Sequence, residues 1–361
     1  MIVYAAVIAD TREVRPGEAL DWSALAGYLR ARLDLGAATS AGTDVQVSQF
    51  PGGHSNLTYL VRFGATELVV RRPPLGPVPP KAHDMAREYH WLEAVNPAFP
   101  LAPKPFLLCE DPSVLGTTFY VMERRNGLVV RRDEPESLAG NPVARRMASE
   151  AIVDALARLH AVDVSTGAVA TLGKPEGFVA RQVRGWTERW ERAKTEEVRE
   201  LDELGAWLAA NMPPEPERPA IVHGDYKLDN VMLDPVDTGR LLAVLDWEMS
   251  ALGDALVDLG IFLAYWAPDG AHAGAPDALT TVTDRPGWLS RDEILDRYAR
   301  ASSRDLSFIG FYEVFARFKI AVVIQQIFVR FVRGQTDDPR FADFGARVRR
   351  LARQAADMAG R

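Results

Sequence analysis

The chain has 361 residues, of which 47% are hydrophobic and 25% charged, and its 27 glycines and 24 prolines are an ordinary share for a folded protein. A net charge of −7 disfavours proteins that bind nucleic acid through a broad positive surface. Its one cysteine, Cys109, excludes an intrachain disulfide and fits a reducing compartment. We therefore expect a cytoplasmic protein of two domains or lobes, with no nucleic-acid partner and no membrane span.

The N-terminal part combines helices with short strands. Asp21 can cap a helix over 22–33, where apolar residues recur at helical spacing. Alternating polar and apolar residues predict three antiparallel strands, joined by short turns, around 45–47, 57–61 and 68–71. The prolines of 73–80 require a loop, and a helix is expected over 85–95.

Two further strands precede a mainly helical region. Apolar runs predict strands at 105–109 and 118–122, and the polar residues 124–127 break the pattern. Beyond this break, apolar periodicity predicts helices over 144–160, 177–194, 200–211, 291–300 and 308–333. The stretch 221–246 interrupts them with two short strands, and 267–286, rich in Gly, Pro, Asp and Thr, is expected to be an exposed loop.

The densest group of polar residues is the segment 223–230, His-Gly-Asp-Tyr-Lys-Leu-Asp-Asn. Phosphoryl transfer requires a carboxylate that accepts or orients the proton of the attacking hydroxyl, and oxygen ligands that hold Mg²⁺ against the phosphates. Asp225 and Asn230 stand five residues apart, the spacing that a kinase catalytic loop uses for its base and a metal ligand. Asp246 follows the apolar run 241–245, where a strand end would present a second metal ligand.

Each of these elements taken alone has an ordinary explanation. His-Gly-Asp can be a simple turn, and an aspartate can end a strand without any role in chemistry. Their occurrence in this order, after a β-rich part and a polar break, is instead typical of a kinase site.

On these residues the chain resembles the aminoglycoside phosphotransferase and choline kinase family, small-molecule kinases with a protein-kinase-like fold. The likeness covers about residues 25–335 and is strongest to the branch related to the kinase-like domain fused to some acyl-CoA dehydrogenases. The stretches that carry it are 69–74, 82–88, 182–186 and 223–230. The resemblance implies an α+β, bilobal fold, with an N-lobe over 1–122 that holds an antiparallel sheet, a hinge over 123–127, and a larger, mainly helical C-lobe over 128–361.

The same resemblance assigns roles to the polar motif. It makes Asp225 the catalytic base, and Asn230 and Asp246 the Mg²⁺ ligands. Lys227 lies two residues after the base, where kinases often place a cation near the γ-phosphate, and the alternative is a solvated lysine. ATP is the expected nucleotide, with GTP as the alternative, and Mg²⁺ is the expected metal.

The resemblance extends the nucleotide site into the N-lobe. The residues expected to form a phosphate-covering loop are Gly52, Gly53, His54, Ser55 and Asn56. Glycine lets backbone N–H groups approach a phosphate, although a Gly-Gly pair alone is more often a hairpin turn. Arg71 occupies the strand position of the family's phosphate-binding lysine, and we expect it to pair with Glu88. Arginine stays charged and binds phosphate bidentately, whereas Arg72, on the other side of the strand, is expected to be solvated.

Met122, Glu123 and Arg125 match the hinge of the family. Adenine would lie against Met122 and would bond to the Glu123 carbonyl and the Arg125 N–H, which are backbone contacts. Asp258 is expected to support the catalytic loop without taking part in the chemistry, and His160 is expected to be structural.

One helix is a candidate for the acceptor side. Gln182, Trp186 and Trp190 share a face at i, i+4 and i+8. The arginines that border this face are Arg181, Arg184, Arg189 and Arg192. Core packing by the two tryptophans is the competing interpretation. As a pocket, an aromatic wall with a cationic rim suits an anionic or acyl-bearing hydroxy compound, whereas a polycationic aminoglycoside would prefer carboxylates. The resemblance to the dehydrogenase-fused branch implies a hydroxyacyl-CoA or a hydroxy acid.

The sequence therefore predicts an ATP·Mg-dependent phosphotransferase that acts on a hydroxyl of a small molecule. The alternatives are an aminoglycoside or amino-alcohol kinase, and a non-catalytic nucleotide-binding regulatory protein, which would not hydrolyse ATP even slowly in the presence of Mg²⁺. A protein kinase is disfavoured, because the chain lacks an Ala-Pro-Glu motif and the span after Asp246 runs directly into Gly253 and a helix.

Overall fold

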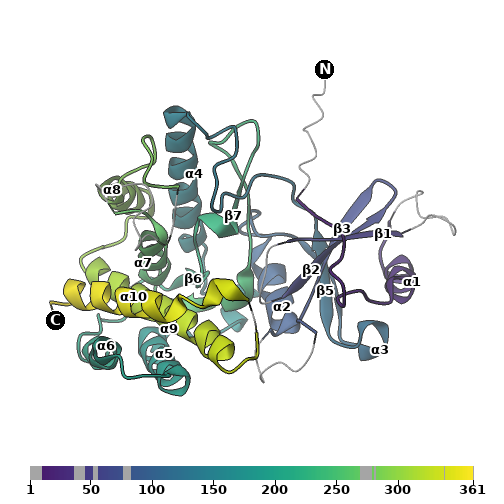
Figure 1. The fold of residues 1–361 in the computed structure, drawn as a ribbon. Helices are drawn as coiled ribbons and strands as arrows, with labels where there is room; N and C mark the ends of the chain where they lie inside the picture. Colours follow the sequence, from purple (N-terminus) through teal and green to yellow (C-terminus); the bar gives the residue numbers. More distant parts are fainter. Residues whose placement is uncertain are drawn as a thin grey trace.

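A five-stranded antiparallel sheet forms the N-terminal lobe of the computed structural model, which describes residues 10–35, 45–51, 56–75, 83–268, 279, 282–336 and 338–360 (Figure 1). Its strands are β1 (Val45–Gln49), β2 (Leu57–Phe63), β3 (Thr66–Arg72), β4 (Pro105–Cys109) and β5 (Phe119–Glu123). They lie in the order β1-β2-β3-β5-β4, with Val69 opposite Met122 and Arg71 opposite Tyr120. Alternation in the sequence predicted three of these strands and apolar runs predicted the other two, and the structure confirms all five.

The two faces of this sheet pack against different helices. Successive side chains of a strand point to opposite faces of the sheet. Phe119 and Val121 therefore pack in one hydrophobic core on the first face, and Tyr120 packs in another core on the second face. Helices α1 (Trp22–Arg32) and α3 (Pro112–Leu115) cover the first face. Helix α2 (Met85–Val95) lies on the second face, toward the rest of the molecule (Figure 1).

The C-terminal lobe is mainly helical. Its helices are α4 (Pro142–His160), α5 (Phe178–Ala193), α6 (Arg199–Ala210), α7 (Leu256–Tyr265), α8 (Arg291–Ser302), α9 (Ile309–Val332) and α10 (Phe344–Met358). Helix α9 is 24 residues long and is buried over most of its length, because α5, α7 and α10 pack around it. In Figure 1 α10 runs beside α9, with α5 and α6 below them.

Four short strands carry the polar motifs of this lobe. They are β6 (Ala220–Val222), β7 (Val231–Leu233), β8 (Leu241–Val244) and β9 (Ala251–Gly253), and they pair as β6 with β9 and β7 with β8. Both pairs are antiparallel, and their apolar side chains belong to the large core of the C-lobe. The segments between these strands therefore emerge from a rigid base.

Several expectations for the C-lobe need correction. The stretch 221–246 holds three strands and not two, because β6 pairs with β9, a partner beyond that stretch. Helix α10 was not predicted, although its buried residues recur at helical spacing. In the described part of the expected exposed loop, Ala267, Val282 and Thr283 are buried. Within the described ranges, no helix has both the length and the apolar character needed to cross a bilayer.

Candidate active site

The segment that follows β6 has a shape that one buried carboxylate fixes. Asp258 on α7 accepts hydrogen bonds from the backbone N–H groups of His223, at 2.6 Å, and Gly224, at 2.7 Å. Gly224 has φ +82°, and a Cβ there would lie 2.6 Å from the Met249 carbonyl oxygen, so glycine is required. His160 contacts the same carboxylate at 3.2 Å, which agrees with the supporting role expected for both residues.

Asp225 lies next in this loop, and two side chains hold its carboxylate. Lys227 Nζ donates to Oδ2 of Asp225 at 2.7 Å, and Asn230 Nδ2 donates to the same oxygen at 2.9 Å. Burial alone would lower the pKa of Lys227. The neighbouring charge of Asp225 outweighs this effect, so that the pKa lies above its usual value. The three residues that the motif predicted are therefore in contact, with Lys227 as a paired cation and not a solvated one.

Asp246 lies two residues after β8 with φ +68°, the left-handed region that few non-glycine residues adopt. Backbone strain of this kind is concentrated at functional sites. Oδ1 of Asp246 accepts a hydrogen bond from Arg71 Nη2 at 2.5 Å, across the gap between the lobes. Burial raises the pKa of Asp246, but the neighbouring Arg71 lowers it to below its usual value, so the carboxylate is ionised.

Arg71 forms the expected ion pair with Glu88, at 3.1 Å between Nε and Oε2. Burial raises the pKa of Glu88, and the guanidinium group opposes this effect.

The expectation for Arg72 was wrong. Its side chain is buried and donates to the carbonyl oxygens of Pro73 and Leu115, both at 3.1 Å, because this face of the sheet is covered by α3. Arg72 is therefore structural.

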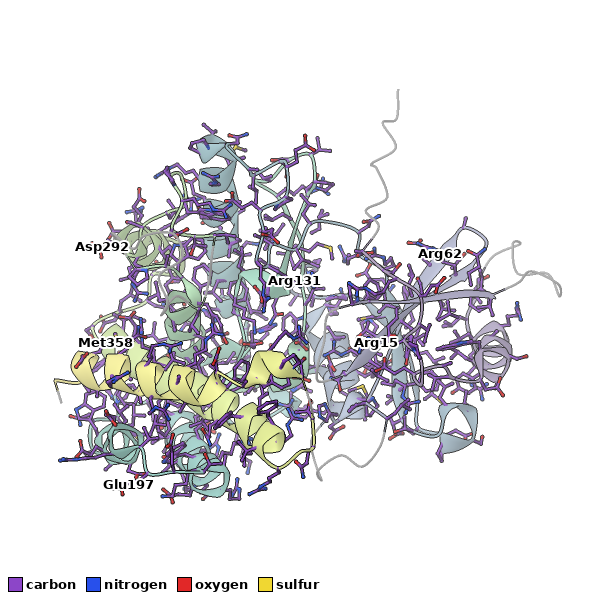
Figure 2. The ribbon with its side chains drawn as sticks, in the orientation of Figure 1. Arg15, Arg62, Arg131, Glu197, Asp292 and Met358 are labelled. Atoms are coloured by element: carbon purple, nitrogen blue, oxygen red, sulfur yellow. The ribbon has the colours of Figure 1, made fainter. Side chains whose placement is uncertain are left out.

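A cavity of about 350 Å³ lies between the sheet and the C-lobe. Ligand pockets of this volume or more are typical for small molecules. Its lining includes Val69, Arg71, Glu88, Met122, Glu123, Arg125, Asn230, Met232, Leu245 and Asp246. In Figure 2, Arg131, another residue of the lining, is labelled between the sheet and the helical lobe. The lining combines apolar and charged side chains, which suit a nucleotide base and its phosphates.

The hinge segment uses its side chains to fix its own path. The carboxylate of Glu123 accepts a hydrogen bond from the Lys104 N–H and another from Arg125, both at 2.6 Å. Arg125 also donates to the Leu242 carbonyl oxygen at 3.2 Å. Because these side chains are engaged with protein, a base in the cavity would meet the hinge through backbone atoms.

Of the expected phosphate-covering loop, Gly52, Gly53, His54 and Ser55 lie outside the described residues. Asn56 is described and is buried. Its Nδ2 donates to Glu248 at 2.9 Å, and its Oδ1 contacts His83 Nδ1 at 2.9 Å. Asn56 therefore connects the start of β2 with the segment that follows Asp246.

Asn230 and Asp246 fit a hard divalent cation such as Mg²⁺. Asn230 donates through Nδ2 to the carbonyl and the carboxylate of Asp225, which leaves its amide oxygen for a ligand role. Oδ1 of Asp246 accepts the hydrogen bond from Arg71, and no described residue donates a hydrogen bond to its Oδ2. Among the described residues, no cluster of three or more acidic, histidine or cysteine side chains could hold a metal by itself. Mg²⁺ commonly binds through one or two protein oxygens together with water and phosphate.

The residues of the acceptor candidate on α5 divide into two groups. Gln182 accepts a hydrogen bond from the indole N–H of Trp186 at 3.2 Å, and Arg189 lies 4.3 Å from the centre of the Trp186 ring. Trp186 is only 3% exposed, so its ring is not an open wall. Trp190 is also buried, and its indole N–H donates to Asp202 on α6 at 2.6 Å. Packing therefore accounts for Trp190, and the proposal below does not use it.

The sequence interpretation missed two cations on the last helices. Lys319 on α9 donates to the Gly224 carbonyl oxygen and lies 5.3 Å from the centre of the Trp186 ring. Arg347 on α10 is half-buried and interacts electrostatically with Tyr265, whose ring centre lies 5.0 Å from Lys227 Nζ. A signal for Lys319 exists in the sequence, because it interrupts an apolar stretch of the helix.

Two lobes that enclose a cavity lined by Arg71, Asn230 and Asp246, with Asn230 bonded to the carboxylate that Lys227 also holds, define a protein-kinase-like phosphotransferase. Residues 46–304 match the phosphotransferase enzyme family. The chain belongs to this family, and its class of enzyme is a small-molecule kinase.

Curated relatives are longer proteins. The chain is similar to acyl-CoA dehydrogenase family member 11 of Gallus gallus, with 32% identity over 360 residues, which are 99% of this chain and 46% of that protein. The Homo sapiens protein of the same name is 31% identical over 359 residues, which are 98% of this chain and 45% of that protein. The chain thus spans less than half the length of these relatives.

Solved structures show the same fold. A protein of Ralstonia eutropha assigned to the aminoglycoside phosphotransferases is 28% identical, with a TM-score of 0.76 over 95% of this chain and 99% of that one. Choline kinase from Cryptosporidium parvum has a TM-score of 0.58 at 13% identity, over 93% and 98% of the two chains. An aminoglycoside phosphotransferase in complex with GDP and kanamycin has a TM-score of 0.59 at 12% identity, over 92% and 97%. The last two comparisons concern the fold alone.

Proposed function

We propose that this chain transfers the γ-phosphoryl group of ATP to a hydroxyl of an anionic small molecule, a hydroxy acid or a hydroxyacyl-CoA, with Asp225 as the base. One observation carries this proposal. The Asp225 carboxylate is held by Asn230 at 2.9 Å, and Asn230 and Asp246 contribute the oxygen atoms suited to a metal that binds phosphates.

In the proposed reaction, the hydroxyl of the acceptor donates its proton to the carboxylate of Asp225 while its oxygen attacks the γ-phosphorus. The bond from that phosphorus to the bridging oxygen of ADP breaks, so the products are a phosphate monoester, ADP and one proton. Lys227 and Arg71 would face the phosphates as fixed positive charges. Asn230 and Asp246 would hold Mg²⁺, which would neutralise the negative charge that develops on the phosphates.

The charges around Asp225 support an anionic acceptor. Arg189 on α5 and Lys319 on α9 interact electrostatically with one another, and Lys319 also with Asp225. Arg347 on α10 is half-buried, and its guanidinium group has no hydrogen bond or ion pair with the residues that the structure describes. Three cations, with Lys319 facing the base, Arg189 beside Lys319 and Arg347 beside Tyr265, would repel a polycationic aminoglycoside and attract a carboxylate or phosphate.

The names of the relatives favour an acyl-bearing acceptor. Proteins named acyl-CoA dehydrogenase family member 11 match nearly the whole of this chain, whereas this chain covers less than half of the length of each. A hydroxyacyl-CoA carries both an acyl chain and several phosphates, so it fits such a name and the cationic surroundings together. We place the reaction in the cytosol, a proposal supported by the buried free thiol of Cys109.

Transfer from labelled ATP tests this proposal directly. Purified protein with Mg²⁺ is offered hydroxy acids, hydroxyacyl-CoAs, amino alcohols and aminoglycosides, with GTP tested in parallel because one solved neighbour holds GDP. Asp225→Asn serves as the inactive control. Labelled product with an anionic acceptor is the expected result. Labelling of kanamycin-type compounds alone would assign the chain to antibiotic modification, and no ATP hydrolysis at all would favour a non-catalytic nucleotide-binding protein.

A further inference from the structure

Helix α9 carries a buried positive charge beside the catalytic loop. Lys319 is 6% exposed and lies in an apolar stretch that packs against α5, α7 and α10. Its Nζ donates to the backbone carbonyl oxygen of Gly224, the residue directly before Asp225. The ring of Trp186 lies 5.3 Å from Nζ and forms part of the same enclosure.

The peptide group that joins Gly224 to Asp225 is therefore fixed at both of its polar atoms. Its carbonyl oxygen accepts from Lys319, and its N–H donates to Nδ1 of His223 at 3.2 Å. The preceding N–H, that of Gly224, donates to Asp258 at 2.7 Å. Because a peptide group is planar and rigid, these contacts set the position of the Asp225 Cα atom, from which the carboxylate extends.

A lysine is an expensive choice at this position. Its ammonium group has three donors, and one of them forms a hydrogen bond to the described residues. No carboxylate of a described residue lies within 4.0 Å of the ammonium group. Burial lowers the pKa of Lys319 to about 8, with Asp225 and Asp258 raising it and Lys227 lowering it. A methionine would fill the same space without this desolvation, so the charge is retained at a cost in stability.

We propose that Lys319 is a positioning residue for phosphoryl transfer, whose ammonium group holds the Gly224 carbonyl oxygen and thereby sets the place of Asp225. The inference rests on the proposed function in one respect, because Asp225 is taken as the base. A charged donor makes a shorter and stronger hydrogen bond to a carbonyl than a neutral one. The position of the base therefore depends on the protonation of Lys319, on a helix that lies outside the matched segment 46–304.

The test compares Lys319→Met and Lys319→Arg with a matched control, Arg317→Met. Arg317 is a buried cation on the same helix, but it donates to the Glu313 carbonyl oxygen and not to the catalytic loop. The assay is Mg²⁺-dependent ATP hydrolysis, in which water replaces the unidentified acceptor. Lys319→Met is expected to lower kcat about 10- to 100-fold with the KM for ATP within about twofold. Its melting temperature is not expected to fall, and Arg317→Met should keep the wild-type kcat.

A pH profile separates positioning from a merely structural role. The wild-type kcat is expected to fall as the pH rises through about 8, because the hydrogen bond loses its charge. The other charged groups that face Lys319 are Asp225, Asp258, Lys227 and Arg189. Lys227 has a raised pKa and Asp258 a lowered one, so neither changes charge there. The fall should be absent in Lys319→Arg, which stays charged.

Hydrogen exchange of the backbone amides in 223–230 gives a readout that needs no activity. Faster exchange in Lys319→Met than in Arg317→Met is expected. Wild-type kcat and wild-type exchange in Lys319→Met would overturn this inference alone. A wild-type protein that hydrolyses no ATP and phosphorylates no acceptor would instead overturn the proposed function, and with it the catalytic meaning of the contact.

Discussion

The guanidinium group of Arg71 lies 2.5 Å from the carboxylate of Asp246, although the two residues belong to different lobes. The same group contacts Glu88 on α2 at 3.1 Å. An ammonium group is a compact charge, whereas a guanidinium group presents five donors in a planar fork. Arginine can therefore bond to both carboxylates and still direct N–H groups toward a phosphate, which explains how it replaces the lysine expected at this position.

Arg71→Ala is expected to weaken ATP binding about 10- to 100-fold. The reason is the loss of charge-assisted hydrogen bonds, worth about 1.5–3 kcal/mol together. Arg72→Ala is the matched control on the same strand, and it should lower the melting temperature while leaving the ATP affinity within about twofold, because Arg72 bonds to buried carbonyl oxygens. Calorimetric titration and thermal unfolding measure the two effects, and equal losses of affinity would contradict the assignment.

Asp225→Asn is expected to lower turnover about 10²–10⁴-fold while Mg·ATP still binds. An amide keeps the shape of the carboxylate but cannot accept the proton of the acceptor hydroxyl. Single-turnover kinetics with labelled ATP and nucleotide titration provide the measurements. Full turnover, or loss of nucleotide binding, would show that Asp225 has another role.

Asp246→Ala should produce the complementary result. The variant removes the charged group of the proposed metal site, so the part of nucleotide affinity that depends on Mg²⁺ is expected to disappear. Titration with ADP in the presence and absence of Mg²⁺ separates this part from the rest. An unchanged Mg²⁺ dependence would mean that the metal binds elsewhere.

Arg347→Ala is expected to raise the KM of an anionic acceptor about 10-fold, and to leave a neutral alcohol of the same shape unaffected. Its guanidinium group would contact the acceptor and not the nucleotide, so ATP affinity should stay within about twofold. Arg353→Ala, at an exposed position on the same helix, is the control. If both variants behave like wild type with every acceptor, the anionic group binds at another place.

Lys319 also makes stability depend on pH in a defined window. Its pKa is about 8 in the folded protein, below its ordinary value of 10.5, so the unfolded chain binds more protons between these values. Stability should therefore rise as the pH increases through this window, by at most about 3 kcal/mol. Lys319→Met lacks the effect. Denaturant unfolding of both proteins at the two ends of the window measures it, and parallel pH dependences would mean that the pKa of Lys319 is not lowered in the folded protein.

The N-lobe and the catalytic loop could be predicted from the sequence because their signals are local. The alternation around 57–61 and 68–71 reports which side chains face a core, and the spacing of Asp225 and Asn230 reports a loop conformation. Both signals lie within a few residues, so no knowledge of distant contacts is required. The ion pair of Arg71 with Glu88 was predicted from the family resemblance, because Arg71 occupies the position of the phosphate-binding lysine.

The contacts that the sequence could not predict are long-range. Arg72 reads as an exposed neighbour of Arg71 until α3 is known to cover its face of the sheet. Lys319 lies 95 residues from Gly224 along the chain, and no periodicity links the two. Trp186 and Trp190 share a helix face, but one packs against Lys319 and the other bonds to α6, a division that only tertiary packing decides.

Helix α2 is bound to both lobes, and this limits how the enzyme can be controlled. Arg87 donates to the backbone carbonyl oxygens of Glu248, at 2.9 Å, and Ser250, while Trp91 belongs to the core of the C-lobe. Protein kinases are switched by moving the helix whose glutamate pairs with the phosphate-binding residue. Displacing Glu88 here would break the contacts of Arg87 and open the core at Trp91. We therefore expect α2 to stay in this position, so that the supply of acceptor and nucleotide, and not a movement of α2, sets the rate of phosphorylation.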